Sequence, residues 1–282
     1  MKVFKKISDI QAFLSGQKQA GRRVGFVPTM GALHRGHTTL VADCKAACDV
    51  AVVSIFVNPT QFNDPKDLVR YPRTIDRDLQ ALINAGCDIL FFPEVAEIYP
   101  PSEITRFYEL GTLEKVFEGA YRPGHFQGVC QVVDKLFAIV RPDQVFFGQK
   151  DYQQCMVIKK LLQMTPGHQA IEMTIAPTIR EANGLAMSSR NMRLTPEEQV
   201  KAGAIYQTLQ SIKEGLRPGD IATLIEASRN ALERKGFIVD YVSVANAQTL
   251  TPINKWDGEK PLVALVAASL SGVRLIDNMI IA

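Results

Sequence analysis

The sequence predicts an α/β fold with a parallel sheet, followed by a smaller α+β domain. Up to about residue 176, apolar β-branched runs alternate with amphipathic helical patterns, which is typical of strand–helix–strand units. After Pro177, helical patterns come first and strand-like runs follow, an order typical of an antiparallel sheet packed against helices. With 282 residues, of which 46% are hydrophobic, the chain is long enough for about two domains.

The elements of the first part follow from the period of their apolar residues. In chain order we expect a helix at 9–19, a strand at 24–27, a helix at 38–48, strands at 50–57 and 88–93 around a helix at 74–86, a small inserted strand and helix at 106–110 and 112–117, a long helix at 126–140, a strand at 143–148, a helix at 151–164 and a strand at 170–175. Because successive parallel strands are joined by right-handed crossovers, residues 1–176 are expected to form a Rossmann-like domain.

The second part contains two consecutive helices and three strand-like runs. Thr195-Pro196-Glu197-Glu198 is a helix-start signal, and a second helix is expected near Asp220. Strands are expected at 238–244, 262–268 and 274–281. Residues 177–282 are therefore predicted to be a separate α+β domain, entered through a linker at 177–183.

Composition excludes several classes of function. A net charge of +3, from 32 basic and 29 acidic residues, gives no broad field to attract nucleic acid or an acidic membrane, so we expect neither partner. The five cysteines are odd in number and scattered, which fits a reducing compartment. No signal-peptide core and no membrane-spanning segment is recognisable, so a cytoplasmic location is expected.

The segment from Pro28 to His37 joins a predicted strand to a predicted helix and contains Gly31 and Gly36. Free N–H groups and the helix dipole at such a junction favour an anion, and glycines let a ligand approach the backbone. His34 and His37, three residues apart, are expected on one face of the first turn. A tight turn with two solvated histidines is an alternative, as is a metal pair, although no third ligand lies nearby.

Two further segments are also candidates for binding an anion. In Gly148-Gln149-Lys150-Asp151 a strand ends in glycine, Lys150 can contact a phosphate, and Asp151 can bind a ribose or lie near a cation. An ordinary helix start is an equally good interpretation. Met187-Ser188-Ser189-Arg190 follows the linker and could clamp a leaving pyrophosphate, although a plain polar linker would look similar.

Other polar residues are candidates for substrate or metal binding. Gln61 and Gln154 lie at the ends of two predicted strands, and amides recognise hydroxyls and carboxylates without adding charge, although either could be an ordinary surface residue. Asp76 and Asp78 could help to hold Mg²⁺ through a phosphate, but stabilisation of the N-terminus of their helix is the favoured interpretation of both residues. His125 precedes the long helix and is a further candidate for the same cleft.

Taken together, these segments resemble the pantothenate synthetase family over nearly the whole chain. Pro28–His37 looks like the HIGH motif of nucleotidyl-transferring α/β enzymes, and Met187–Asn191 resembles their mobile KMSKS segment. The blocks that carry the narrower resemblance lie, in order, at 28–37, 56–62, 71–74, 122–126, 147–154 and 187–191. The family resemblance implies that pantoate and β-alanine are condensed with ATP through a pantoyl adenylate, releasing AMP and pyrophosphate.

The resemblance also implies roles for individual residues. Catalysis is expected from His34, His37, Lys150, Ser188, Ser189 and Arg190. ATP is expected to contact Met30, Gly31, Ala32, Leu33, His34, Arg35, Gly36, His37, Gly148, Gln149, Lys150, Asp151, Ile179, Met187, Ser188, Ser189 and Arg190. Gln61 and Gln154 would bind pantoate, and Gln61 would also contact β-alanine.

The remaining expectations concern the metal, the domains and assembly. Mg²⁺ is expected with ATP, but its protein ligand is left unassigned because Arg77 stands between Asp76 and Asp78, where related sequences often have a more acidic cluster. Residues 1–176 would bind ATP and pantoate, and residues 177–282 would form a lid. Family members are typically homodimers through the N-terminal domain.

Three alternatives remain open on the residues alone. A nucleotidyltransferase that joins AMP to a phosphate acceptor would use the same two motifs without an amide-forming step. A nucleotide-binding regulatory module would bind ATP without catalysis. An aminoacyl-tRNA synthetase is disfavoured because the C-terminal hundred residues show no basic patch for RNA.

Overall fold

The structure, a computed structural model, describes residues 1–101 and 106–282 and divides into two compact units. Unit 1 comprises Met1–Leu110, Arg122–Gly148 and Gln154–Pro177. Unit 2 comprises Gly111–Tyr121, Gln149–Gln153 and Thr178–Ala282. Two short segments that precede residue 154 thus belong to the same unit as the C-terminal part of the chain.

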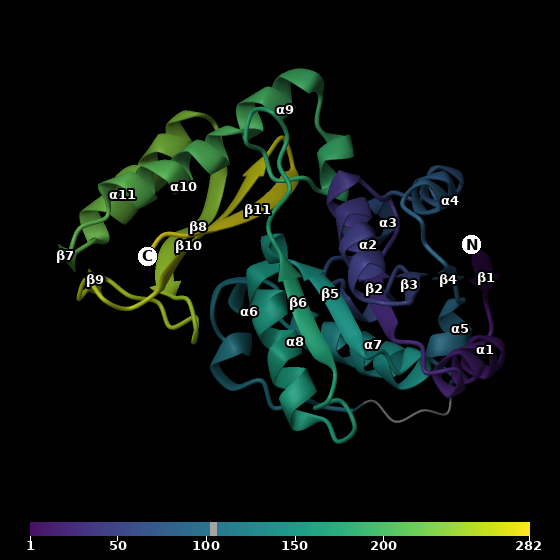
Figure 1. Ribbon diagram of the computed structural model, residues 1–282. Helices are drawn as coiled ribbons and strands as arrows, with labels where there is room; N and C mark the ends of the chain where they lie inside the picture. Colours follow the sequence, from purple (N-terminus) through teal and green to yellow (C-terminus); the bar gives the residue numbers. More distant parts are fainter. Residues whose placement is uncertain (102–105) are drawn as a thin grey trace. The chain divides into compact units, whose positions relative to one another are not determined.

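Unit 1 is built on a six-stranded parallel sheet (Figure 1). Its order is β1 (Lys2–Phe4), β4 (Ile89–Phe91), β3 (Val50–Ile55), β2 (Val24–Thr29), β5 (Gln144–Gly148) and β6 (Glu172–Ala176). The chain builds outward from β2 through β3 to β4 on one side and from β5 to β6 on the other, so the strand order reverses between β2 and β5. Open α/β sheets bind ligands beyond the carboxyl ends of the strands at such a reversal. The predicted Rossmann-like class is confirmed.

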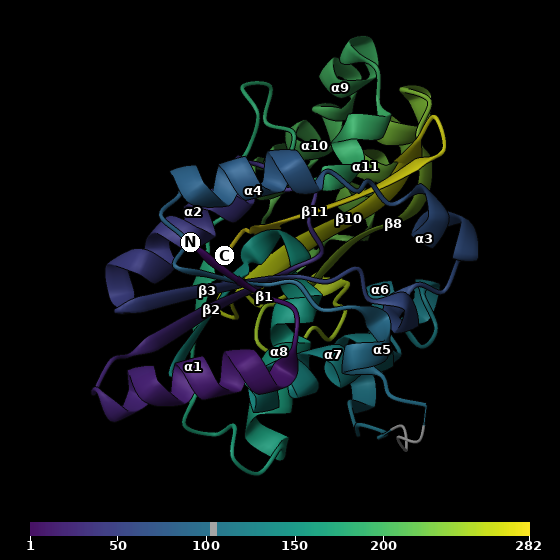
Figure 2. The same cartoon turned by 90° about the vertical axis from the view of Figure 1, so that its right-hand side faces the viewer.

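Helices cover both faces of this sheet (Figure 2). On one face lie α2 (Arg35–Ala47) and α4 (Ile75–Asn84), whose apolar residues share a core with the strands. On the other lie α1 (Ile7–Gln19) and α7 (His125–Val140), which contact each other and β2. A Cβ at Gly25 of β2 would collide with the sulfurs of Cys44 and Cys48, so this glycine lets α2 approach the sheet closely.

Among the described residues, the other helical elements of the first part are six short ones and the longer, well-buried α8. They are η1 (Pro59–Gln61), α3 (Pro65–Arg70), α5 (Val95–Ile98), η2 (Gly111–Glu114), α6 (Phe117–Tyr121), η3 (Gln149–Asp151) and α8 (Tyr152–Met164).

Two details differ from expectation. Lys2–Phe4 forms an edge strand that is too short to give a sequence period, and its register with β4 is set by tertiary pairing. The strand expected at 106–110 is wrong. There, Tyr108 exchanges both backbone hydrogen bonds with the Gln127 side chain of α7, at 3.0 and 2.8 Å, instead of with a strand.

Unit 2 contains an antiparallel sheet of β8 (Ile238–Asn246), β10 (Leu262–Leu270) and β11 (Val273–Ile280), in the order β11-β10-β8. Helices α10 (Ala204–Gly215) and α11 (Ala222–Arg234) share its core, and β7 (Gly219–Asp220) pairs with β9 (Lys255–Trp256). The α+β prediction is confirmed. The first expected helix is divided at Gly203 into α9 (Pro196–Ala202) and α10. Gly203 lies against Asn183, where a Cβ would be 2.8 Å from the carbonyl oxygen.

Candidate active site

The loop between β2 and α2 has an unusual backbone conformation. Gly31 and Ala32 both have positive φ, +78° and +50°. The left-handed region is easily reached by glycine but is strained for alanine. Thr29 supports the start of the loop, since its hydroxyl donates to Ser54 O at 2.7 Å and accepts from Gly31 N at 3.2 Å.

His34 and His37 form a reciprocal cap at the start of α2. His34 Nδ1 accepts from Gly36 N at 3.1 Å, and His37 Nδ1 accepts from His34 N at 3.3 Å. The ring centroids are 4.0 Å apart, so the two side chains do share one face of the first turn. Because each Nδ1 is an acceptor, the neutral rings have their N–H on Nε2, which leaves that nitrogen as the donor.

The backbone N–H groups of this junction are not free, in contrast to the sequence-based expectation. The N–H groups of His34 and Gly36 donate to the imidazoles, and those of Ala32 and Leu33 donate to the buried Asp78 carboxylate at 2.9 and 2.8 Å. The backbone N–H groups that the sequence pattern predicted as phosphate donors are therefore already bonded to side chains of the protein itself. The histidine rings become the more suitable anion contacts of this loop.

The loop after β3 lies against the loop after β2. Gln61 Nε2 is 3.2 Å from Met30 Sδ, and Gln61 Oε1 accepts from Asn58 Nδ2 at 3.1 Å. Asn58 is 1% exposed and also donates to Gly128 O of α7 at 3.0 Å. Two predicted site residues from separate loops, Met30 and Gln61, are thus in contact. Asn58 orients the amide, a role that the sequence analysis did not assign.

His125 also supports this loop from the first turn of α7. Its Nδ1 is 2.8 Å from Gln61 O, and its Nε2 is 3.1 Å from Arg122 Nη1. A carbonyl can only accept, so Nδ1 carries the proton and Nε2 accepts from the guanidinium. His125 therefore holds the backbone of Gln61, and it is 5% exposed.

In unit 2, η3 carries Lys150 and is held by β11. Asn278 is 2% exposed, and its Nδ2 donates to Gln149 O at 2.9 Å and to Lys150 O at 2.8 Å. The Lys150 ammonium is 3.4 Å from Asp151 Oδ1, and the two side chains are 18% and 46% exposed. Nothing in the local sequence pattern indicated Asn278, because it is far away in the chain. Gly148, the last residue of β5, belongs to unit 1.

The serine-arginine segment at 187–190 is the second anion-binding candidate in unit 2, and the helix η4 (Ser189–Arg193) that it begins also contacts β11. Met187 N donates to Ile179 O at 2.9 Å, so two residues expected at the nucleotide pair across one hairpin. Ser188 then caps η4, accepting from Arg190 N at 3.3 Å. Both η3 and η4 contact β11. The structure therefore brings the lysine segment and the serine-arginine segment onto one strand.

The neighbouring glutamines at the start of α8 have different environments. Gln153 is 3% exposed and bonded at both ends of its amide, accepting from Glu118 N at 3.0 Å and donating to Leu113 O and Val116 O. Gln154, the predicted pantoate ligand, belongs to unit 1 and is half-buried. Gln153 is thus a structural anchor for residues 111–121.

The described residues contain no group of three or more His, Cys, Asp or Glu side chains suited to hold a metal. Asp78 is buried and engaged by backbone N–H groups, whereas Asp76 is exposed. All five cysteines are buried and none forms a disulfide, and burial raises the pKa of Cys87 to about 12. Buried protonated thiols are poor metal ligands.

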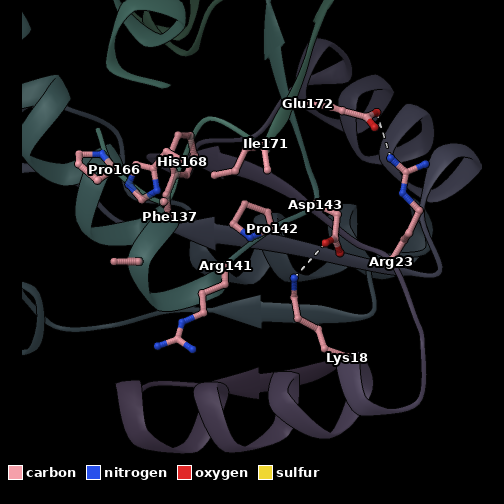
Figure 3. A pocket seen from close by; sticks show the side chains of 13 residues that line it. Lys18, Arg23, Phe137, Arg141, Pro142, Asp143, Pro166, His168, Ile171 and Glu172 are labelled. Atoms are coloured by element: carbon pink, nitrogen blue, oxygen red, sulfur yellow. Dashed lines mark hydrogen bonds and ion pairs between the residues drawn. The ribbon is translucent and has the colours of Figure 1, made fainter. Parts of the chain in front are cut away.

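A hollow of about 630 Å³ lies elsewhere in unit 1, beside the amino ends of β5 and β6 (Figure 3). Lys18 pairs with Asp143 at 3.0 Å, and Arg23 pairs with Glu172 at 3.0 Å, so two of its cations are neutralised within the chain. None of the predicted site residues lines it. No helix among the described residues has both the length and the apolarity needed to span a membrane.

The chain is similar to known proteins over its full length. A sequence model of the pantoate-beta-alanine ligase family matches residues 2–280. The pantothenate synthetase of Alteromonas mediterranea is 47% identical over 282 residues, with 99% of each chain covered. That of Cytophaga hutchinsonii is 43% identical over 278 residues, which cover 98% of this chain and 97% of the relative.

Solved structures show the same similarity. The pantothenate synthetase from Thermus thermophilus has a TM-score of 0.91 and 40% identity, covering 100% of this chain and 99% of that chain. The pantoate-beta-alanine ligase from Francisella tularensis, complexed with beta-gamma ATP and beta-alanine, has a TM-score of 0.83 and 35% identity, covering 99% of this chain and 97% of that chain.

Proposed function

The chain belongs to the pantoate-beta-alanine ligase family, and we propose that it forms pantothenate in two steps through a pantoyl adenylate. It is an ATP-dependent ligase that joins pantoate to β-alanine. In the first proposed step a pantoate carboxylate oxygen attacks the α-phosphorus of ATP, and the bond to the β-phosphate oxygen breaks to release pyrophosphate. In the second, the β-alanine amine attacks the acyl carbon, loses a proton, and displaces AMP.

The observation that carries this proposal is the contact between Met30 and Gln61. It joins the loop expected at the ATP phosphates to an amide suited to bind a small hydroxy acid. We propose that Gln61 and Gln154 bind pantoate and that Gln61 also contacts β-alanine. An adenylation site needs the acid and the α-phosphate side by side, because the reaction rate depends on their alignment.

The proposed catalytic groups stabilise charge and do not act as nucleophiles. The Nε2–H groups of His34 and His37, the Lys150 ammonium and the Arg190 guanidinium suit the charge that develops on the phosphates. Ser188 and Ser189 add neutral donors. The other proposed ATP contacts are Gly31, Ala32, Leu33, Arg35, Gly36, Gly148, Gln149, Asp151, Ile179 and Met187.

Mg²⁺ is proposed to enter as part of the ATP complex. Magnesium at nucleotide sites is commonly held by phosphates and water with only one or two carboxylates, so a protein cage is not required. Asp151 is the half-exposed carboxylate beside Lys150 and is suited to contact the hydrated ion. When bound, the ion would neutralise phosphate charge.

We further propose a cytoplasmic homodimer in which residues 1–176 bind ATP and pantoate and residues 177–282 act as a lid. Five cysteines that form no disulfide are consistent with a reducing compartment. A lid would protect the reactive mixed anhydride from water.

An omission assay tests the function. Complete mixtures should yield AMP, pyrophosphate and pantothenate. Leaving out pantoate should abolish ATP cleavage, and leaving out β-alanine should reduce it to a single turnover. Formation of ADP, or unchanged turnover without β-alanine, contradicts the proposal and favours a different nucleotidyl transfer.

A further inference from the structure

Asp78 connects α4 to the loop that carries His34 and His37. Its position indicates a role in addition to stabilising the N-terminus of its own helix. We propose that Asp78 is a positioning residue for adenylation, a role that rests on the function proposed above. Its carboxylate holds the backbone of Ala32 and Leu33, and so sets where the imidazoles of His34 and His37 lie.

The geometry is specific to a carboxylate. Oδ2 accepts from Ala32 N at 2.9 Å, and Oδ1 accepts from Leu33 N at 2.8 Å and from the Thr74 hydroxyl at 3.1 Å. Asp78 is 2% exposed, so its carboxylate is held by donors from within the chain. Successive backbone N–H groups that converge on one anion form a nest. Here the anion is supplied by the protein.

The loop needs such a support because of its backbone conformation. Ala32 has φ of +50°, which an L-residue seldom adopts unless its surroundings enforce it. Gly31 cannot be larger without displacing the support, since a Cβ there would lie 3.0 Å from Asp78 Oδ2 and 3.0 Å from Ile55 Cγ2. The loop conformation and the carboxylate therefore depend on each other.

Neighbouring residues make it possible to separate positioning from other roles. Asp76 has the same charge and also lies in the first turn of α4, but it is exposed. An effect of the helix dipole should be shared by both carboxylates, whereas support of the loop belongs to Asp78 alone.

The test compares Asp78→Asn with Asp76→Asn in the full-length enzyme. An asparagine can accept one N–H, but its amide nitrogen would face the other donor. Adenylation is measured as pantoate-dependent exchange of pyrophosphate into ATP, per folded enzyme, and KM is measured for each substrate. We expect the adenylation kcat of Asp78→Asn to fall about 20-fold or more, with the β-alanine KM within about two-fold. Asp76→Asn should stay near the parent.

A second variant applies if Asp78→Asn does not fold. Thr74→Val removes only the hydroxyl that bonds Oδ1 and should lower the adenylation kcat about three-fold in the same direction. An unchanged kcat per folded enzyme in these variants overturns the proposal. So does a defect of Asp78→Asn that saturating MgCl₂ restores, because that identifies a cation ligand. The parent enzyme in the omission assay tests the proposed function separately.

Discussion

His37 combines two roles that one substitution affects differently. Its Nδ1 caps the helix backbone, and its Nε2 is the side suited to donate to a phosphate. A hydrogen bond that strengthens as charge develops contributes more to the transition state than to ATP binding.

We therefore expect His37→Ala to lower the adenylation rate on the order of 100-fold and to raise the ATP KM by less than about ten-fold. Thr39→Ala is the control, because the Thr39 hydroxyl donates to Arg35 O at 2.9 Å in the same helix. Pyrophosphate exchange at several ATP concentrations gives both constants. Equal losses in rate and affinity would indicate a binding role only.

Asn278 offers a second test at the scale of a residue, for the lysine segment of unit 2. Asn278→Ala leaves two carbonyls without their donor, so we expect a loss of about 1–3 kcal/mol in the free energy of unfolding and a higher ATP KM. Asn278→Asp keeps the size but removes the donors, and it should be no better than alanine. Urea unfolding and ATP kinetics measure the two effects. Full activity in Asn278→Asp would show that packing alone matters.

At the scale of elements, the approach of α7 to η1 sets the position of Gln61. A Cβ at Gly128 would lie 2.6 Å from Gln61 N and still closer to Thr60 O. In a helix, alanine is normally more favourable than glycine by roughly 0.5–1 kcal/mol. Here the steric conflict opposes that propensity.

We expect Gly128→Ala to raise the pantoate KM about ten-fold or more and to destabilise the enzyme by roughly 1–3 kcal/mol. Gly16→Ala in α1 is the matched control, since a Cβ there has no atom within 4 Å. That variant should be slightly stabilised, with unchanged kinetics. Thermal unfolding and steady-state rates distinguish the two glycines, and similar behaviour of both would contradict the packing argument.

At the scale of the whole molecule, buried protonated groups determine the response to alkaline pH. Burial raises the pKa values of Cys44, Cys87, Tyr108 and Tyr241, and the carboxylate of Asp134, 2.6 Å from the Tyr108 hydroxyl, acts in the same direction on Tyr108. In the unfolded chain these groups ionise at their ordinary values, about 8.5 for cysteine and 10 for tyrosine.

The direction in which stability changes with pH follows from this difference in pKa between the folded and the unfolded chain. Below about pH 8 both states hold these protons, and the stability they support is fully present. As pH rises through about 8.5 to 10.5, the unfolded chain ionises first and is favoured. We expect the urea midpoint to fall over this range, and Tyr108→Phe to reduce the slope at its upper end. A midpoint that does not change up to about pH 10.5 would rule out the effect.

Local patterns predicted much of this architecture. Residues 50–57 are mostly apolar and rich in β-branched side chains, and β3 is buried at every position from Val50 to Ile55. The helix expected at 126–140 corresponds to α7, from His125 to Val140. Lys2–Phe4 gave no such pattern, because three residues are too few to define a period.

The sequence by itself determined the fold class, the family and the loops that carry the candidate residues, because periodicity and motif spacing are properties of neighbouring residues. Only the tertiary structure decided what supports those loops. Asp78 reaches Ala32 across 46 positions, and Asn278 reaches Lys150 across 128. A buried polar side chain that bonds a distant backbone leaves no periodic signal, since its partner is chosen by the packing of the folded chain.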